Sequence, residues 1–384
     1  MSVLGIVAEY DPFHNGHLRH LRSAMDAVSP SAVLAAVSGP FKQRGGLALL
    51  SPFARAECAL ASGVDAVFAL PVLWTVRDAE HYALGAVSLL SSLGATHLAF
   101  GAETADLPLL QRTADLLEDS PLRLQDALHA ALAEGKGYPS AVAEAAGACI
   151  PESRSLLNQA NNILAVCYLR AVRRLGVPLV PVVIPRSGAY HADRIDIISP
   201  SASAVRNSLR RGNWDALSAL PEVSVSAVRS AFLARQVPDP ARFSVLLLGA
   251  LRAMSPAQAS CLPDCTEGLD AALLKAAASA GSGEELLAAL TTRRYSAARI
   301  SRLCAHALLG VTRDRLEHLQ LPSAVLLLGI KKNPSLTGSW KSGPVRVLSA
   351  AKWQEQADLL DLAAWRLWSL ACGLPASWLF TQRL

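Results

Sequence analysis

The stretch Glu9-Tyr10-Asp11-Pro12-Phe13-His14-Asn15-Gly16-His17 decides how the rest of the chain is interpreted. It follows the apolar run Val3–Ala8 and leads into a helical pattern, which predicts a strand, a loop and a helix start. Histidines three residues apart lie on one face of a helix, where unpaired backbone amides also attract anions. The stretch therefore predicts a phosphate-binding loop, although a histidine pair at this spacing is also common as a purely structural feature.

Further apolar runs, each ended by a polar loop, follow along the first half of the chain. Helical patterns lie between them, one beginning at Ser51-Pro52 and ending at Gly63. Strands that alternate with helices predict an α/β fold with a Rossmann-like parallel sheet, whose ligands bind at the carboxyl ends of the strands. The runs predicted as strands after the first are Ala32–Val37, Val64–Leu70, Thr96–Phe100 and Leu179–Ile184.

The second half of the chain has a different character. After Gly212, strand-like runs become rare and Ala- and Leu-rich helical stretches dominate, so we predict domains at residues 1–212 and 213–384, the second mainly helical. Its densest basic segment is predicted to contact RNA phosphates, with a solvated helix face as the alternative. The basic residues of this segment are Arg293, Arg294, Arg299 and Arg302.

Composition narrows the class of protein. The chain has 384 residues, 52% of them hydrophobic and 17% charged, with a formal net charge of +5. This balance is typical of a packed globular protein and permits a nucleic-acid partner. Seven scattered cysteines predict no disulfide framework. Because the chain shows neither a membrane-spanning apolar run nor a signal peptide, we expect a cytoplasmic location and no membrane or protein partner.

The first motif resembles the histidine–glycine–histidine motif of the nucleotidyltransferase superfamily, which includes class I tRNA synthetases and adenylyltransferases. More narrowly, residues 5–18 resemble the bacterial tRNA(Met) cytidine acetate ligase family. The resemblance covers most of residues 1–210 and, more thinly, residues 290–335. Further segments support it in the expected order: Ser38-Gly39-Pro40-Phe41-Lys42-Gln43-Arg44-Gly45, Ser62-Gly63-Val64-Asp65, Phe100-Gly101-Ala102-Glu103, Asn161-Asn162-Ile163-Leu164 and Ser201-Ala202-Ser203-Ala204-Val205-Arg206.

The resemblance implies a nucleotidyltransferase domain followed by a tRNA-binding domain, and a two-step reaction. ATP and acetate would form acetyl-adenylate and pyrophosphate. The wobble cytidine of elongator tRNA(Met) would then attack the acetyl carbonyl, giving N4-acetylcytidine and AMP. Mg²⁺ is expected with the ATP, but no metal site is expected in the protein, because Cys261 and Cys265 lack a second pair of ligands.

The resemblance also implies roles for individual residues. His14 and His17 would be catalytic, and the loop residues Gln43 and Arg44 would contact acetate or RNA. Helix capping is the alternative for the asparagines and serine of the site, and a turn or solvated position for Gly101 and Arg186. The implied ATP-binding residues are Val7, Ala8, Glu9, Tyr10, Gly16, His17, Gly101, Asn161, Asn162, Arg186, Ser203 and Arg206.

The chain departs from the family at several positions. Asp11 stands where Asn is usual, and because it adds a negative charge near a triphosphate site we expect it to change metal or ATP affinity without abolishing adenylation. The other departures are Gly46-Leu47 for Glu-Pro, Pro52 for a basic residue, and Gln159-Ala160 where Pro is usual. Two further functions stay open: an adenylyltransferase for a small phosphorylated metabolite, and a non-catalytic RNA-binding protein with a decayed nucleotide site.

Overall fold

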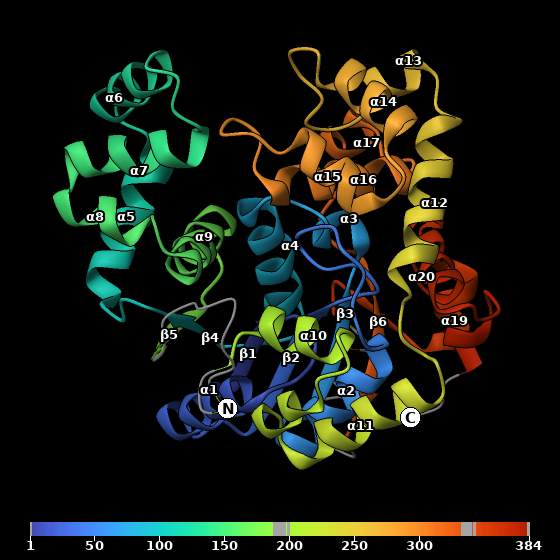
Figure 1. Cartoon of the computed structure of the whole chain (residues 1–384). Helices are drawn as coiled ribbons and strands as arrows, with labels where there is room; N and C mark the ends of the chain where they lie inside the picture. The colour runs from blue at the N-terminus through green and yellow to red at the C-terminus, as the bar shows by residue number, and fades with distance from the viewer. Residues whose placement is uncertain (1, 187–196, 198–199, 332–339, 341–342, 382–384) are drawn as a thin grey trace.

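The computed structural model describes residues 2–186, 197, 200–331, 340 and 343–381 (Figure 1). In this part of the chain seven strands form one sheet in the order β5-β4-β1-β2-β3-β6-β7. Strands β1 to β5 are parallel, and β6 runs antiparallel to β3. The strands are β1 (Val3–Ala8), β2 (Ala32–Ser38), β3 (Ala66–Leu70), β4 (His97–Ala102), β5 (Val180–Pro185), β6 (Ala324–Ile330) and β7 (Arg346–Leu348).

The predicted α/β fold class is confirmed, because each of the five apolar runs forms a parallel strand. The central strand β2 is buried along its whole length, as expected where helices cover both faces of a parallel sheet. One face packs against α4 (Ala79–Ser92) and α9 (Ala160–Leu175). The other face packs against α1 (Asn15–Val28), α2 (Pro52–Ser62) and α20 (Leu359–Cys372).

Local capping fixes where these helices begin and end. The Ser51 hydroxyl accepts a hydrogen bond from the backbone N–H of Ala54, with Pro52 in the first turn, and Gly63 ends α2 at a φ of 127°. Helix α9 ends at Gly176 in the left-handed conformation that glycine adopts without strain. The sequence signals for the start and end of α2 are therefore confirmed.

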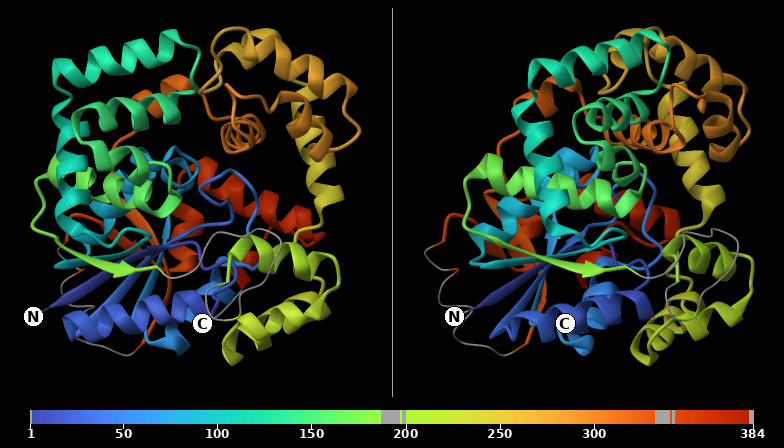
Figure 2. Two further views of the ribbon diagram at one scale, coloured as in Figure 1. Left: turned by 60° about the vertical axis from the view of Figure 1, so that its left-hand side comes forward. Right: turned by 90° about the vertical axis from the view of Figure 1, so that its left-hand side faces the viewer.

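Two groups of helices stand apart from the sheet and form two arms (Figures 1 and 2). The first arm comprises α5 (Leu107–Asp119), α6 (Leu122–Ala133), α7 (Tyr138–Cys149) and α8 (Pro151–Leu156). The second arm has its own apolar core and comprises α12 (Pro240–Arg252), α13 (Pro256–Ser260), α14 (Leu269–Ser279), α15 (Gly283–Leu290), α16 (Ala297–Leu309) and α17 (Arg313–Glu317). The arms approach each other at Gly137, where an added Cβ would lie 3.3 Å from the carbonyl oxygen of Arg293.

The remaining elements connect these parts. A small core joins the loop after β2 to α10 (Ala202–Arg210), η1 (Trp214–Ala219) and α11 (Glu222–Leu233). The short elements α3 (Val72–Thr75), α19 (Ala350–Gln356) and η2 (Trp378–Thr381) complete the described chain. Strands β6 and β7 come from beyond residue 212 and extend the sheet, so the second half is not helical throughout. The domain boundary near residue 212 stays a prediction.

Candidate nucleotide site

The two motif histidines hold each other at the start of α1. The backbone N–H of His17 donates to Nδ1 of His14 at 3.3 Å, and the backbone N–H of His14 donates to Nδ1 of His17 at 3.2 Å. This reciprocal pattern is a capping box in which two imidazoles replace the usual hydroxyl and carboxylate. An added Cβ at Gly16 would lie 3.0 Å from Cε1 of His14, so a residue without a side chain gives the ring its space.

The capping geometry also determines which ring nitrogens carry protons. The rings stack with centroids 3.6 Å apart, and each Nδ1 already accepts a hydrogen bond. Burial, with the Arg186 and Arg206 charges, lowers the pKa of His14 to about 3, and burial likewise lowers the pKa of His17 well below its usual value. Both rings are therefore neutral near pH 7 and carry their proton on Nε2, which makes each Nε2–H a hydrogen-bond donor.

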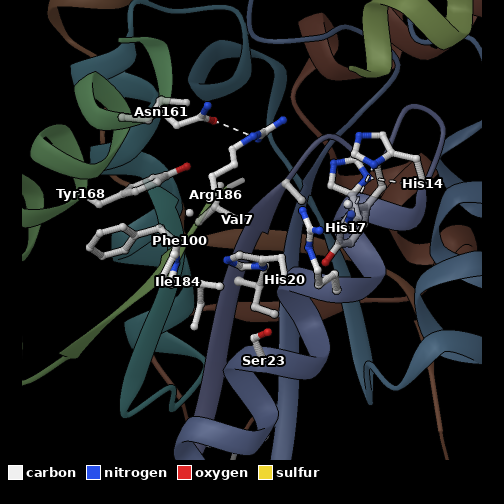
Figure 3. A pocket seen from close by; sticks show the side chains of 18 residues that line it. Val7, His14, His17, His20, Ser23, Phe100, Asn161, Tyr168, Ile184 and Arg186 are labelled. Carbon is white, nitrogen blue, oxygen red and sulfur yellow. Dashed lines mark hydrogen bonds between the residues drawn. The ribbon is translucent and has the colours of Figure 1, made fainter. Parts of the chain in front are cut away.

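These histidines line a pocket of about 470 Å³ at the carboxyl ends of β1, β4 and β5 (Figure 3). Figure 3 shows His14 and His17 on one side of it, and Phe100, Tyr168 and Arg186 across from them. Nine of the residues predicted for the site line this pocket: Val7, Ala8, Tyr10, His14, Gly16, His17, Gly101, Asn161 and Arg186.

A short network fixes the wall opposite the histidines. The Nδ2 of Asn161 donates to Glu103 at 2.5 Å, and Oδ1 of Asn161 accepts from Nη1 of Arg186 at 3.1 Å. Glu103 also accepts from the backbone N–H of Asn162 at 2.9 Å. Since the amide nitrogen of Asn161 faces Glu103, its oxygen must face Arg186, and the guanidinium is held beside the pocket.

Four predicted ATP-binding residues do not line the pocket. Asn162 is buried and donates to Thr104 Oγ1 and Gln159 Oε1, so its described contacts are those of a structural side chain. Glu9 accepts from the backbone N–H of Gln43 at 2.9 Å. Arg206 and Ser203 bond to each other at 3.0 Å, and Nη1 of Arg206 donates to the carbonyl oxygen of Asp11 at 2.6 Å. Arg206 therefore stabilises the backbone of the histidine loop at Asp11.

Asp11 is buried rather than aimed into the pocket. Its Oδ1 accepts from the backbone N–H groups of Leu49 at 2.7 Å and Leu50 at 3.2 Å, which joins the histidine loop to the loop after β2. Burial alone would raise the pKa of Asp11, but the charges of Lys42, Arg206 and Arg55 outweigh it and lower the pKa. The added negative charge is therefore matched locally.

A buried arginine that the sequence did not single out braces the same region. Arg55, on α2, is 0% exposed and donates to the carbonyl oxygens of Glu9 at 2.6 Å, Gly39 at 2.5 Å and Leu50 at 3.2 Å. These carbonyls belong to the loops after β1 and β2. A single guanidinium thus fixes the ends of two strands that border the site.

The loop carrying Gln43 and Arg44 lies away from the pocket, against the second arm. Nε2 of Gln43 donates to the carbonyl oxygen of Arg77 at 2.5 Å, and Arg44 is exposed. Gly45 has a φ of 88°, and an added Cβ would lie 2.4 Å from the carbonyl oxygen of Ser301, so only glycine fits this close approach. Neither Gln43 nor Arg44 lines the pocket.

The predicted basic segment is a loop followed by α16. Arg293 and Arg294 are exposed, and Arg294 forms an ion pair with Glu267. Arg299 lies over the ring of Tyr295 at 4.9 Å and donates to the carbonyl oxygen of Asp264 at 2.9 Å. Arg302 is half-buried, and its Nε has no hydrogen-bond partner among the described residues. The four arginines therefore occupy different environments rather than one uniform stripe.

Several pocket residues escaped sequence reasoning. His20 follows His17 by one helical turn, and burial lowers its pKa to about 4. Its position on the face of His17 was the available signal. The other residues are apolar or aromatic, as ordinary core residues of strands and helices are, so their sequence did not indicate a ligand. They are Phe100, Leu164, Tyr168 and Ile184.

The described part of the chain contains no group of three or more His, Cys, Asp or Glu side chains placed to hold a metal ion. None of its helices combines the length and apolarity required to cross a membrane.

Comparison with protein families matches residues 1–370 to the model of the HIGH Nucleotidyl Transferase family. The chain is 33% identical over 345 residues to a Kosmotoga olearia protein named tRNA(Met) cytidine acetate ligase, covering 87% of this chain and 81% of that one. It is 37% identical over 347 residues to a protein of the same name from Syntrophotalea carbinolica, covering 87% and 80%.

Solved structures of Thermotoga maritima TmcAL share the fold. The apo form aligns with a TM-score of 0.91 at 30% identity, covering 97% of this chain and 95% of that chain. A form bound with alpha-thio ATP aligns with a TM-score of 0.88 at the same identity and coverage.

Proposed function

The chain belongs to the tRNA(Met) cytidine acetate ligase family of HIGH nucleotidyl transferases, and from this premise we propose that it activates acetate with ATP and acetylates the wobble cytidine of elongator tRNA(Met). One observation supports this most directly: the two Nε2–H donors of His14 and His17 face a pocket large enough for a nucleotide. The pocket lies where ligands bind on parallel sheets.

In the first step an acetate oxygen attacks the α-phosphorus of ATP. The bond from this phosphorus to the bridging oxygen breaks, and pyrophosphate leaves with the electron pair. The Nε2–H groups of His14 and His17 stabilise the charge that develops on the phosphate oxygens. Arg186, held by Asn161, adds a fixed positive charge on the opposite wall. The side chains bind and orient the reactants, and no protein nucleophile is required.

In the second step the exocyclic amine of the cytidine attacks the acetyl carbonyl carbon. The bond between that carbon and the AMP oxygen breaks, AMP leaves, and the amine nitrogen loses one proton. The products are N4-acetylcytidine and AMP.

We propose that Mg²⁺ binds together with ATP. Since the described residues offer no three-ligand site, we assign the ion to the substrate phosphates and water, as is usual for magnesium nucleotides. When bound, it would neutralise charge on the leaving pyrophosphate. The location we propose is the cytoplasm, where the tRNA substrate is found.

The test is incubation of the protein with ATP, labelled acetate and unmodified tRNA, followed by nucleoside analysis. We expect labelled N4-acetylcytidine in tRNA(Met) and acetate-dependent exchange of pyrophosphate into ATP. A small-metabolite adenylyltransferase would show no exchange until its own acceptor is added, and no labelled nucleoside. A non-catalytic RNA-binding protein would show tRNA binding with no exchange, and either outcome would overturn the proposal.

A further inference from the structure

Three segments far apart in sequence meet beside the second arm, outside the nucleotide pocket. The loop after β2 packs its Gly45 against the backbone of Ser301 and Arg302. Nε2–H of His306, on α16, donates to the carbonyl oxygen of Val76 at 2.8 Å. Gln43 donates to the carbonyl oxygen of the next residue, Arg77. These contacts fix the relative positions of the loop after β2, the segment before α4, and α16.

The meeting point is rich in arginine. We call Arg44, Arg77, Arg299 and Arg302 the arginine junction. Arg77 is only 9% exposed, yet its guanidinium has no hydrogen bond or ion pair with any described residue. The Nε of Arg302 is buried and likewise unpartnered within the described chain. The positive charge of Arg302 lies close enough to lower the pKa of Arg77, after burial, which has the largest effect.

The nearby carboxylates of Asp78 and Asp264 compensate this charge only in part. Asp78 is committed to the start of α4, where its side chain accepts from the backbone N–H groups of Glu80 and His81 and pairs with the His81 ring at 2.7 Å. Asp264 affects Arg77 and Arg302 through its charge, but the contact it makes with Arg299 uses its backbone carbonyl. Four arginines thus face two aspartates, and a net positive charge is left in a partly buried position.

The guanidinium of Arg77 is neutralised only in part and is not engaged by the described residues, so it is available to an external anion. A guanidinium fork matches the geometry of phosphate oxygens and tolerates dehydration better than an ammonium group. The pocket that we assign to ATP is lined by none of these four arginines, so the nucleotide does not supply the partner. We propose that the arginine junction binds backbone phosphates of the RNA substrate.

This inference rests on the proposed function for its ligand, a tRNA, but its chemistry is that of any RNA phosphodiester. The junction also explains how a distant phosphate contact reaches the reaction centre. Gln43 bridges the two sites, because its backbone N–H donates to Glu9, directly after β1, while its side chain holds Arg77. RNA bound here therefore sits at a fixed position relative to the histidine loop.

The experiment compares Arg77→Gln and Arg302→Gln with Arg229→Gln, an exposed arginine on α11 as the matched control. Binding of unmodified tRNA is measured over a range of salt concentrations. Each junction variant should reduce the slope of log affinity against log salt by about 0.7 to 0.9, the value for one lost phosphate contact. Arg77→Lys should keep most of the slope, and Arg229→Gln should keep all of it.

A structural role predicts a different result. If Arg77 stabilised the fold, Arg77→Gln would lower the melting temperature, whereas removal of an unpaired charge should leave it unchanged or raise it. An unchanged salt slope in both junction variants would overturn the inference. Acetate-dependent pyrophosphate exchange by the unaltered protein is measured separately, because its absence would refute the proposed function without touching the phosphate site.

Discussion

The nucleotide pocket and the arginine junction hold their proposed ligand-binding groups in different ways. In the pocket, His14 and His17 satisfy each other, and Glu103, Asn161 and Arg186 form a continuous hydrogen-bonded chain. At the junction, the guanidinium of Arg77 and the Nε of Arg302 lack partners in the described chain. The difference teaches that the protein itself fixes the donors proposed for ATP, whereas it leaves the remaining charge at the junction to a ligand.

The reason lies in what each site must recognise. Transfer at a single phosphorus atom requires donors fixed to within a fraction of an ångström, so the pocket donors are oriented before ATP arrives. Contacts to an RNA backbone contribute mainly charge and tolerate variation in position. Mutations should therefore separate the two sites by the kind of effect as well as by its size.

The largest effect is expected from His17→Ala. Loss of one donor to the transition state should slow acetate-dependent pyrophosphate exchange by about 100- to 1000-fold. Since His17 also caps α1, His17→Gln is the matched control, because its amide offers both an acceptor for the His14 N–H and a donor. We expect partial recovery with Gln, and near-normal exchange by folded His17→Ala protein would remove the catalytic role of this ring.

A smaller and more selective effect is expected from Arg299→Ala combined with Arg302→Ala. Acetyl transfer to tRNA should fall while acetyl-adenylate formation persists, because these side chains lie outside the pocket. Up to two lost phosphate contacts correspond to a change in salt slope of roughly 1.4 to 1.8. The two half-reactions are compared on one purified variant, and an equal loss in both would mean that α16 supports the fold or the pocket instead.

Asp11→Asn should affect folding more than ATP binding, which revises the expectation from sequence. Asn keeps an acceptor for the amides of Leu49 and Leu50, but it removes the negative charge that faces Lys42, Arg206 and Arg55, so the free energy of unfolding should fall by about 1 to 3 kcal/mol at neutral pH. Because the folded-state pKa lies below 3.8, this stabilisation is present above 3.8 and is lost as pH falls through the folded value. Denaturant unfolding at both pH ranges, with ATP affinity in parallel, tests this, and a changed affinity with unchanged stability would contradict it.

The smallest effect is expected from pH. With the pKa of His14 at about 3 and that of His20 at about 4, both stay neutral as pH passes through 6.5, and ATP affinity should barely change there. Stability behaves differently, because the unfolded histidines take up protons first and destabilise the fold as pH falls from 6.5 toward 4. Titration of ATP affinity and of the melting temperature checks both, and an affinity that drops as pH rises through 6.5 would indicate a charged histidine.

The sequence was most informative where one local pattern determines one element. The apolar runs, Ser51-Pro52 and Gly63 predicted strands and helix boundaries that the structure confirms. Strand β6 was missed because its seven residues, Ala324–Ile330, are apolar and lie in an Ala- and Leu-rich half, where periodicity cannot separate a short buried strand from a helix.

The site shows the same limit. The pairing of His14 with His17 follows from spacing on one helix, so sequence could predict it. The sequence could not indicate Arg77 as a binding residue, because its place in the arginine junction depends on contacts with α16. That helix lies more than two hundred residues further along the chain. Asn162 was predicted beside ATP because the family resemblance implied both asparagines of the pair, yet a shift of one residue on a helix turns a side chain by about 100°.

Strand order along the sheet has a consequence for synthesis on the ribosome. Strand β3 pairs with β6, which lies roughly 250 residues further along the chain. At translation rates of about 5 to 20 residues per second, the free edge of β3 stays unpaired for on the order of 10 to 50 s before β6 is synthesised. An unpaired apolar edge is prone to pair with other chains. A nascent chain therefore passes through a long interval in which a chaperone or slow aggregation competes for the edge that the protein's own C-terminal half later covers.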